Sequence, residues 1–245
     1  MPKLGLIGKD ILYSFSKAHF TAKFENESLP FSYENFDIDD IYRLPEIIKT
    51  HKNLVGLNVT IPYKEKVIPL LDDLSKKAKK IGAVNTISIS PTGRLKGYNT
   101  DYYGFKKSIE PFLKPHHRAA LILGTGGASK AIAYTLKKLG IEYDYVSRKQ
   151  QPKAKFLYSD LTESIISTYS IIINCTPIGT YPNVNECPDI PYDGISSDHI
   201  LYDLVYNPIH SKFLVCGELK GATTSNGFHM LELQAEKAWE IWKLT

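Results

Sequence analysis

Residues 116–140 read "HHRAALILGTGGASKAIAYTLKKLG" and hold the pattern that most restricts the architecture. A short apolar run predicts a strand, Gly124, Gly126 and Gly127 predict a tight turn, and the residues after them predict a long helix. Glycines at such a turn let backbone N–H groups approach a pyrophosphate at the N-terminus of the helix. A strand–helix turn without a ligand is the alternative, but the flanking strand and helix favour dinucleotide binding. Ser129 stands where the common fingerprint has its third glycine.

The end of the following strand bears on which dinucleotide binds. An NAD site places a carboxylate about 20 residues after the glycines, on the ribose 2′-hydroxyl. The predicted strand "EYDYVS" (142–147) instead leads into Ser147, Arg148 and Lys149, and Asp144 lies too early in the strand. A hydroxyl and two cations favour a 2′-phosphate, and therefore NADP. The alternative is that both cations are solvated loop charges.

Strands and helices alternate along the chain, which is typical of α/β architecture with parallel sheets. Before residue 101 we predict strands within 3–8, 31–38 and 55–62, helices from Ser16 and within 41–49, and a hairpin over 82–101. A helical region carries Val67, Leu70, Leu71 and Leu74, interrupted by Pro69. After residue 101 we predict a helix over 101–113, further strands within 155–158, 170–177, 199–206 and 221–225, and a last helix over 229–242. A nucleotide-binding domain thus follows, or is inserted into, an N-terminal α/β domain.

Composition excludes several classes of protein. The 245 residues carry a net charge of +4 with scattered lysines, which argues against nucleic-acid binding. Three dispersed cysteines and the absence of an HExxH-like arrangement argue against a disulfide framework or a metal site. The N-terminus lacks a signal-peptide pattern and no apolar run is long enough to span a bilayer. We therefore expect a cytoplasmic protein that binds neither nucleic acid nor membrane.

Residues 54–65, "LVGLNVTIPYKE", combine a strand pattern with polar groups. Val55, Leu57, Val59 and Ile61 alternate with polar or small residues, which predicts one aliphatic face packed inward. Asn58 and Thr60 share the opposite face, and Lys64 follows Pro62. Two more polar clusters, at Asn85 ("GAVNT") and Asp101 ("GYNTD"), end predicted strands. Each alone is more often a turn or cap, but three on a chain with a dinucleotide turn favour a hydroxyl-rich substrate.

With these blocks the sequence resembles the shikimate dehydrogenase family over essentially the whole chain. The matching blocks, in chain order, are "YSFS" (13–16), "GLNVTIPYK" (56–64), "LSKKAKKIGAVNTI" (74–87), "GYNTDYYGF" (97–105), "GTGGAS" (124–129), "NCTPIGT" (174–180), "YDLVYNP" (202–208) and "GFHMLELQA" (227–235). The resemblance implies a substrate-binding domain over 1–101, completed by the C-terminal helix 228–245, and a Rossmann-like NADP-binding domain over 102–227. The site would lie between them.

The resemblance also implies roles for single residues. Ser14 and Ser16 would bind the substrate carboxylate, while Lys64 and Asp101 would form the catalytic pair. The groups expected to bind the substrate's ring hydroxyls or to fix the substrate are Asn58, Thr60, Asn85, Tyr206 and Gln234. The groups expected to contact the cofactor are Gly124, Gly126, Gly127, Ala128, Ser129, Ser147, Arg148, Lys149, Leu204 and Gly227.

The implied reaction is the reversible NADP-dependent reduction of 3-dehydroshikimate to shikimate, a step of aromatic amino acid and chorismate biosynthesis. It needs a hydride and a proton for the nascent alkoxide. The ammonium of Lys64, oriented and kept charged by Asp101, suits stabilisation of that alkoxide, and the sequence leaves open which of the two residues transfers the proton. A quinate/shikimate dehydrogenase with relaxed substrate or cofactor choice is the nearest alternative, and a non-catalytic NADP-binding sensor is a third. We expect a monomer or homodimer.

The span after Ser147 departs from the family pattern. A parallel crossover usually needs a dozen or so residues, and "SRKQQPKA" (147–154) is too short for a full helix. We therefore expect a trimmed loop on the adenosine side of the cofactor site.

Overall fold

The structure, a computed structural model, describes residues 1–11 and 14–244. Tyr13 of the "YSFS" block and Thr245 at the end of the 228–245 segment lie outside the described residues. The chain forms two compact units: unit 1 is 1–100 with 235–245, and unit 2 is 101–234. The prediction that 1–101 with 228–245 and 102–227 are domains with separate binding roles stays a prediction.

Unit 1 is built around a mixed sheet of six strands in the order β2-β1-β3-β5-β6-β4. Its elements are β1 (Lys3–Gly8), α1 (Phe15–Asn26), β2 (Ser32–Asp37), η1 (Ile41–Arg43), α2 (Leu44–Thr50), β3 (Leu54–Val59), η2 (Ile68–Leu70), β4 (Asp73–Leu74), α3 (Lys76–Ile81), β5 (Thr86–Ile89), β6 (Leu95–Tyr98) and the last part of α8 (Phe228–Trp242). Strands β1, β2 and β3 are parallel, whereas β5 is antiparallel to β3 and β6. The predicted hairpin is confirmed, and an all-parallel sheet holds only for unit 2.

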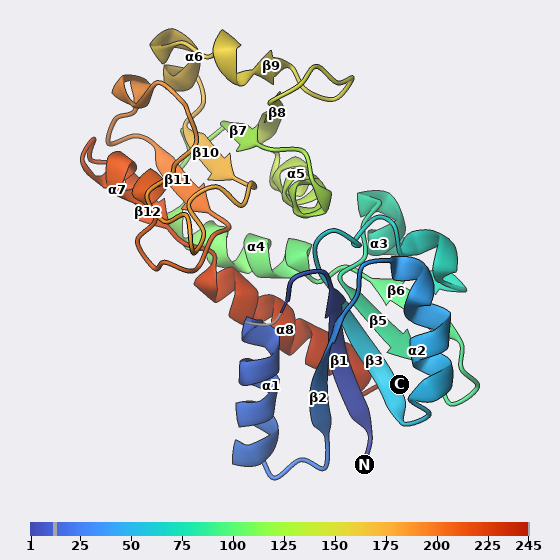
Figure 1. Cartoon of the computed structure of the whole chain (residues 1–245). Coiled ribbons are helices and arrows are strands. Elements are labelled where there is room, and N and C mark those ends of the chain that lie inside the picture. The colour runs from blue at the N-terminus through green and yellow to red at the C-terminus, as the bar shows by residue number, and fades with distance from the viewer. Residues whose placement is uncertain (12–13, 245) are drawn as a thin grey trace. The chain divides into compact units, whose positions relative to one another are not determined.

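Two apolar layers cover the sheet of unit 1, with α1 and α2 on its opposite faces (Figure 1). Leu57 and Val59 of β3 pack with Leu44 and Ile47 of α2. On the other face, aromatic rings from α1, β2 and α8 pack together: Phe20, Phe24, Tyr33, Trp239 and Trp242. The C-terminal helix thus returns to the first part of the chain, as predicted, and supplies four of the ten buried residues of this layer.

The predicted aliphatic face of β3 is wrong for Val55 and for Ile61. The register of β1 and β3 shifts because Lys3 pairs with Leu54 while Leu4 pairs with Gly56, which leaves Val55 as an extra residue. Val55 therefore packs in the layer of α1 and α8, opposite Leu57. Ile61 lies beyond the strand and is 65% exposed.

Gly56 is small because the indole of Trp242 lies against its backbone. A Cβ built on Gly56 would come within 2.3 Å of Trp242 Nε1. That nitrogen donates a 2.9 Å hydrogen bond to the carbonyl of Ile87 on β5. The glycine of the strand pattern is thus explained by packing of the C-terminal helix, with no ligand needed.

The predicted helical region over Val67–Leu74 is also wrong. Pro69 lies within the 3-10 helix η2, and Asp73–Leu74 then pairs with β6 as the short strand β4. The apolar side chains still pack against the core, with Val67 fully buried. The spacing of these apolar residues reflects their burial, and Pro69 prevents a regular helix.

Unit 2 is a Rossmann-type sheet whose six strands are all parallel, in the order β12-β11-β10-β7-β8-β9. Its elements are α4 (Asp101–Ile109), η3 (Glu110–Phe112), β7 (Ala119–Leu123), α5 (Gly127–Leu139), β8 (Glu142–Ser147), β9 (Phe156–Leu157), η4 (Tyr158–Asp160), α6 (Glu163–Ser167), β10 (Ile171–Asn174), η5 (Tyr192–Gly194), β11 (Ile200–Asp203), α7 (Lys212–Glu218), β12 (Thr223–Ser225) and the first part of α8. The predicted Rossmann-type parallel sheet is confirmed.

The central strands of unit 2 are buried on both faces. In β10, Ile171 and Ile173 join the layer that contains α4 and α5, while Ile172 joins the layer that contains α6 and α7. Such strands read as continuous apolar runs because helices cover both sides of a parallel sheet. The runs "ALIL" and "IIIN" were recognisable for this reason.

Strand β9 explains how the trimmed loop closes a parallel crossover. It pairs only with the last two residues of β8, Val146 with Phe156 and Ser147 with Leu157. Between the end of β8 and the start of β9, the chain therefore runs back along the strand direction by only about two residues, roughly 7 Å. The connection 148–155 manages this without a helix, so the short loop predicted from the sequence is confirmed. Its place on the adenosine side of a cofactor site stays a prediction.

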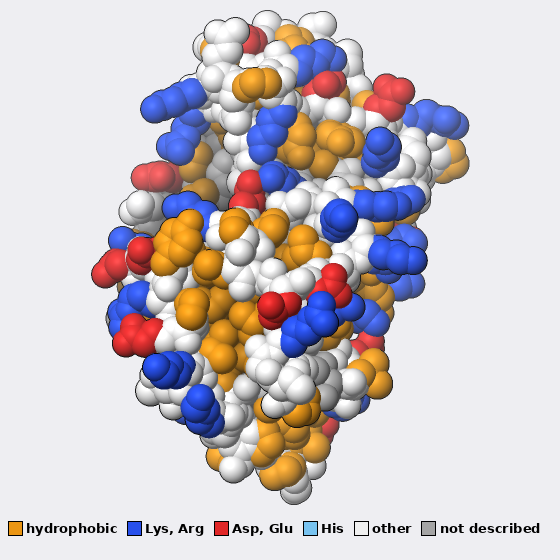
Figure 2. All heavy atoms as spheres, turned by 90° about the vertical axis from the view of Figure 1, so that its right-hand side faces the viewer, with side chains coloured by type: hydrophobic (Ala, Val, Ile, Leu, Met, Phe, Trp, Pro, Cys, Tyr) orange, Lys and Arg blue, Asp and Glu red, His pale blue; other side chains and the backbone are white. Residues whose placement is uncertain are grey.

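The surface shows no segregation of charge on the face drawn in Figure 2, where Lys and Arg side chains are interspersed with Asp and Glu. Within 1–11 and 14–244, no helix is long and apolar enough to cross a membrane.

The contact between Gly56 and Trp242 can be tested by stability. We expect Gly56→Ala to lower the free energy of unfolding by about 2 kcal/mol, because the added methyl overlaps the indole. Both tryptophans of the chain lie in the unit 1 part of α8. Urea denaturation followed by tryptophan fluorescence therefore reports on this unit.

The matched background is Trp242→Leu, in which Trp239 remains as the reporter. There the methyl meets no indole, and Gly56→Ala should be neutral or slightly stabilising, as alanine usually is relative to glycine in a strand. An equal loss of stability in both backgrounds would contradict the packing explanation.

Candidate functional site

Asn58 lies at the end of β3 and is held by hydrogen bonds on both ends of its amide. Its Oδ1 accepts from the hydroxyl of Tyr33 at 2.7 Å. Its Nδ2 faces the carbonyl of Asn85 at 3.3 Å and Oγ1 of Thr86 at 3.4 Å. Asn58 is 4% exposed, and Ser16 on α1 hydrogen-bonds the same Tyr33 hydroxyl. Two predicted substrate residues from distant parts of the sequence thus share one phenol.

Asn85 connects the second polar cluster with the third. Its Oδ1 accepts from the backbone N–H of Thr100 at 2.7 Å, and its Nδ2 donates to Oγ1 of Thr100 at 2.9 Å. Thr86 Oγ1 donates to Asn85 Oδ1 at 3.1 Å. Thr100 immediately precedes Asp101 in the chain. The three clusters seen in the sequence are therefore joined by side-chain hydrogen bonds within unit 1, up to Thr100.

Ser14 caps the N-terminus of α1, where its Oγ accepts from the N–H of Lys17 at 3.3 Å. The same hydroxyl donates to Oδ1 of Asn35 at 3.1 Å. Asn35 in turn donates to the carbonyl of Ile11 at 3.0 Å, so β2 fixes the start of α1. The cap uses a lone pair of this oxygen, whereas the predicted carboxylate-binding role needs the hydroxyl proton, which is donated to Asn35 here.

Thr60 and Lys64 follow β3 in unit 1, and both are half-buried. The N–H of Thr60 donates to the carbonyl of Ile7, and the carbonyl of Lys64 accepts from the N–H of Val84 at 2.7 Å. Because Val84 precedes Asn85, the backbone of Lys64 is tied to the segment before β5 that carries Asn85.

Asp101 and Gln234 belong to unit 2, and both are buried. Asp101 is the first residue of α4, and Gln234 on α8 lies against Gly104 of the same helix. A Cβ on Gly104 would come within 3.2 Å of Gln234 Cβ and within 2.4 Å of the Met230 carbonyl. This close packing of α8 on α4 fixes the backbone position of Gln234, from which its side chain extends.

The glycine turn joins β7 to α5. Gly124 has φ +99°, a conformation that favours glycine, and an added Cβ would meet Cγ2 of Thr176 at 2.8 Å. Gly126 is the N-cap of α5, and among the described residues no side chain caps it. A Cβ on Gly126 would have no described atom within 4 Å, so its place opens to solvent. Gly127, Ala128 and Ser129 form the first turn, with Ser129 Oγ donating to the Gly126 carbonyl at 2.7 Å.

The loop 148–155 folds back onto this turn. Nε2 of Gln151 donates to Oγ of Ser147 at 2.5 Å and to Oγ1 of Thr125 at 2.9 Å. Nζ of Lys153 donates to the carbonyl of Thr125 and lies 5.3 Å from the centre of the Tyr145 ring. Neither Gln151 nor Lys153 was predicted as a site residue, because a loop of irregular spacing gives no periodic signal.

Arg148 and Lys149 are exposed at the end of β8, and Ser147 is buried there. Arg148 lines a pocket of about 340 Å³ whose other lining residues are Leu157, Tyr158, Ser159, Ile178 and Asp189. Burial raises the pKa of Tyr158 to about 12. Within the described chain, its buried hydroxyl has no hydrogen-bond partner. Asp144 is engaged elsewhere, with Lys155 at 2.7 Å and Tyr169 at 2.6 Å.

Leu204 and Gly227 are in contact, because a Cβ on Gly227 would come within 2.4 Å of the Leu204 carbonyl. The preceding residue, Asp203, is fully buried and accepts hydrogen bonds from Asn174 at 2.9 Å, from the Val205 N–H at 3.0 Å and from Ser211 at 2.5 Å. Burial raises its pKa to about 6 despite these donors. Asp203 thus fixes the start of the loop that leads to the half-buried Tyr206.

The structure offers no metal centre within 1–11 and 14–244, where no three His, Cys, Asp or Glu side chains form a metal-binding group. The site residues are amides, hydroxyls, one carboxylate and cations instead. A Rossmann-type unit with an open glycine turn, in one chain with a second unit that holds buried amides, is typical of the class of nicotinamide-dependent dehydrogenases.

Comparison with known proteins identifies the family. Residues 6–87 match the profile described as the shikimate dehydrogenase substrate binding domain. The NADP(+) shikimate dehydrogenase of Methanosphaera stadtmanae is 38% identical over 256 residues, spanning 97% of this chain and 90% of that protein. The chain belongs to the shikimate dehydrogenase family.

Two solved structures are similar over the full chain. Shikimate 5-dehydrogenase of Thermus thermophilus, in complex with NADP(H) and shikimate, is 29% identical with a TM-score of 0.87, covering 100% of this chain and 94% of that one. Quinate dehydrogenase of Corynebacterium glutamicum, in complex with NAD, is 27% identical with a TM-score of 0.86, again covering 100% and 94%.

The open position at Gly126 gives a test of the glycine turn. Its φ of −74° suits any residue, so Gly126→Ala should leave the thermal midpoint of unfolding unchanged. A bound pyrophosphate would meet the new methyl group, and we expect the Kd for NADPH to rise about tenfold or more. Fluorescence titration with NADPH measures the binding, and circular dichroism serves as the stability control. An unchanged Kd would mean that the pyrophosphate of NADPH does not bind beside Gly126.

Proposed function

We propose that this protein catalyses the reversible, NADP-dependent reduction of 3-dehydroshikimate to shikimate. The proposal rests on full-length similarity to shikimate dehydrogenases. The observation in the structure that carries it is the buried network in which Ser16, Asn58 and Asn85 converge near the backbone of Lys64. Buried amides and hydroxyls suit a small polyhydroxylated acid, because each needs a polar partner.

In this proposal, unit 1 binds the substrate. Ser14 and Ser16 donate to its carboxylate from the start of α1. Asn58, Thr60 and Asn85 bind its ring hydroxyls, and the proposal includes Tyr206 and Gln234 among the substrate-binding residues. Such a site discriminates strongly, since a substrate lacking one hydroxyl leaves a buried polar group of the protein unpaired.

The cofactor binds unit 2, and the residues present fit it. Residues 124–129 offer the open N-terminus of the thirteen-residue helix α5 to the pyrophosphate. Arg148 and Lys149, with Ser147, bind the 2′-phosphate, in a region where Asp144 is already paired with Lys155. Leu204 and Gly227 border the nicotinamide. When bound, NADPH supplies the hydride.

Lys64 and Asp101 act as the catalytic pair. The ammonium of Lys64 stabilises the oxygen that gains charge at C3 and donates the proton to it. Asp101 orients the ammonium and balances its charge. The proposal is supported by the hydrogen bonds that tie Lys64 to Val84 and Asn85 to Thr100, the residue before Asp101. In the reverse direction the same pair removes the proton.

Quinate is the nearest rival substrate, because quinate dehydrogenase of Corynebacterium glutamicum shares the fold. Ser14 and Ser16 together favour shikimate, and the cations after β8 favour NADP over NAD. A monomer or homodimer and a cytoplasmic location stay predictions.

The direct test is a spectrophotometric assay with both substrates and both cofactors. We expect oxidation of NADPH by 3-dehydroshikimate, a higher kcat/KM with NADPH than with NADH, and a higher kcat/KM for shikimate than for quinate in the reverse direction. Preference for quinate would move the protein to the rival activity. NADPH binding without turnover of either substrate would favour a sensor.

The role of Lys64 can be tested by Lys64→Ala. We expect kcat to fall about 100- to 1000-fold, because proton donation and charge stabilisation are both lost, while KM for shikimate changes less and the Kd for NADPH is unchanged. Lys66→Ala is the matched control: it removes an exposed lysine two residues further on and should turn over normally. Near-normal kcat in the Lys64 variant would refute the assignment.

A further inference from the structure

Tyr33 lies at the start of β2, and its hydroxyl forms hydrogen bonds with two proposed substrate residues. The side chain is 6% exposed, its oxygen is 2.7 Å from Asn58 Oδ1, and Ser16 hydrogen-bonds the same oxygen. No sequence motif identified this tyrosine as a site residue. In the proposed function it does not itself contact the substrate. Its effect on the site is transmitted by Asn58 and Ser16.

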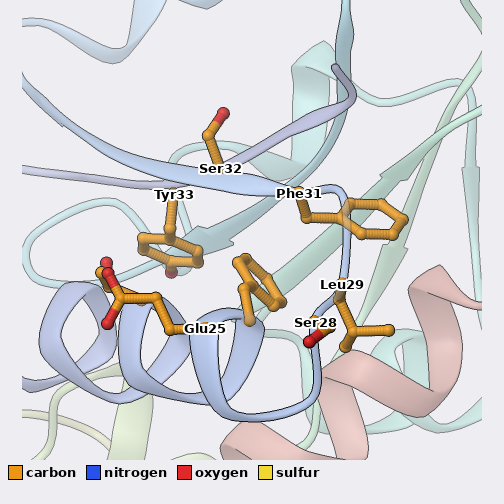
Figure 3. A pocket seen from close by; sticks show the side chains of 8 residues that line it. Glu25, Ser28, Leu29, Phe31, Ser32 and Tyr33 are labelled. Atoms are coloured by element: carbon orange, nitrogen blue, oxygen red, sulfur yellow. The ribbon is translucent and has the colours of Figure 1, made fainter.

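The ring of Tyr33 is fixed by packing. It stacks on Phe20 of α1 with ring centres 4.8 Å apart and an angle of 14° between the planes. It also lines a pocket of about 370 Å³ beside α1, where Figure 3 shows it near Glu25, with Phe31 and Leu29 on the far side. A tyrosine has only two side-chain torsions, so this packing also fixes its hydroxyl oxygen.

The direction of each hydrogen bond follows from the partners. The carbonyl oxygen of Asn85 can only accept, so Nδ2 of Asn58 faces it and Oδ1 faces Tyr33. Oδ1 can only accept in turn, and Tyr33 therefore donates to Asn58. Burial raises the pKa of Tyr33 well above its usual value, which keeps the donor proton in place. Ser16 then donates to the Tyr33 oxygen.

This arrangement prepares both groups for the substrate. The carbonyl oxygen of Asn58 is committed to Tyr33, while its Nδ2 makes only two long contacts, at 3.3 and 3.4 Å. The amide nitrogen is thus the end presented to a substrate hydroxyl oxygen. Ser16 can rotate its hydroxyl and donate to a substrate carboxylate instead. Tyr33 then loses the hydrogen bond that it accepts from Ser16 but keeps the one that it donates to Asn58.

We propose that Tyr33 is a positioning residue for substrate recognition, which holds the Asn58 amide in the orientation that donates to a substrate hydroxyl. The inference rests on the proposed function of unit 1, because it presumes that Asn58 binds the substrate. It extends the site by one residue that lies behind the groups in contact with substrate.

The test is Tyr33→Phe, which keeps the ring packing and removes the hydroxyl. We expect the Kd for shikimate, measured by calorimetry, and its KM to rise about five- to tenfold, as for one lost hydrogen bond. The values of kcat and the Kd for NADPH should change less than about twofold. The matched control is Tyr202→Phe, which removes a buried hydroxyl bonded to Ser108 at 2.6 Å in unit 2. It should lower thermal stability without changing the Kd for shikimate.

A double-mutant cycle separates positioning from general damage. In an Asn58→Ala background, Tyr33→Phe should change the Kd for shikimate by less than about twofold, since the residue through which it acts is gone. If the wild type binds shikimate, either of two results would overturn this inference alone. The first is that the effects of the two substitutions on the Kd for shikimate are additive, and the second is an unchanged Kd in the Tyr33→Phe variant. A wild type that neither binds nor oxidises shikimate would overturn the proposed function together with it.

Discussion

Unit 1 depends on the indole of Trp242 resting on the bare backbone of Gly56 and donating to the carbonyl of Ile87. That contact holds the last turn of α8 across β3 and β5, and the helix completes an aromatic layer whose other members include Phe20 and Tyr33. Asn58 lies two residues after Gly56, on the same face of the sheet. Helix α8 therefore stabilises the face that carries the proposed substrate groups. Segments far apart in the sequence must fold together before these groups are held in place.

Polar groups in unit 1 are buried but paired with one another. Asn58, Asn85 and Thr100 come from three separate segments, and each satisfies part of the hydrogen-bonding capacity of another. Such a network is rigid, because rotating any one amide leaves a buried donor or acceptor without a partner. The network therefore sets the orientation of the proposed substrate groups before any ligand arrives. Unit 2 contrasts with this arrangement, since Gly126, the N-cap of α5, has no side chain to cap the helix and a Cβ there would meet no described atom within 4 Å. One unit presents preset donors, and the other presents an open helix end.

Much of the fold was predictable because its signals are local. The central strands β7 and β10 of unit 2 are apolar runs buried on both faces, and Gly124 has the positive φ that its place in the glycine turn suggested. The errors came from long-range effects. Val55 changed face because β1 and β3 pair with a register shift, and the apolar residues from Val67 to Leu74 were buried without forming a regular helix. At the site, the polar clusters were visible as motifs. Tyr33, Gln151 and Lys153 were not, because their importance arises from partners 4 to 28 positions away in the chain.

The eight residues between β8 and β9 have an evolutionary implication. Because β9 pairs only with Val146 and Ser147, this connection supports no helix and bears little of the sheet's packing. Arg148, Lys149, Gln151 and Lys153 all lie on this one uninterrupted peptide. Mutation can change the exposed side chains of this segment while Ala154 keeps its place against the apolar layer. On the proposal that Arg148 and Lys149 bind the 2′-phosphate, nucleotide preference can therefore change without loss of the fold.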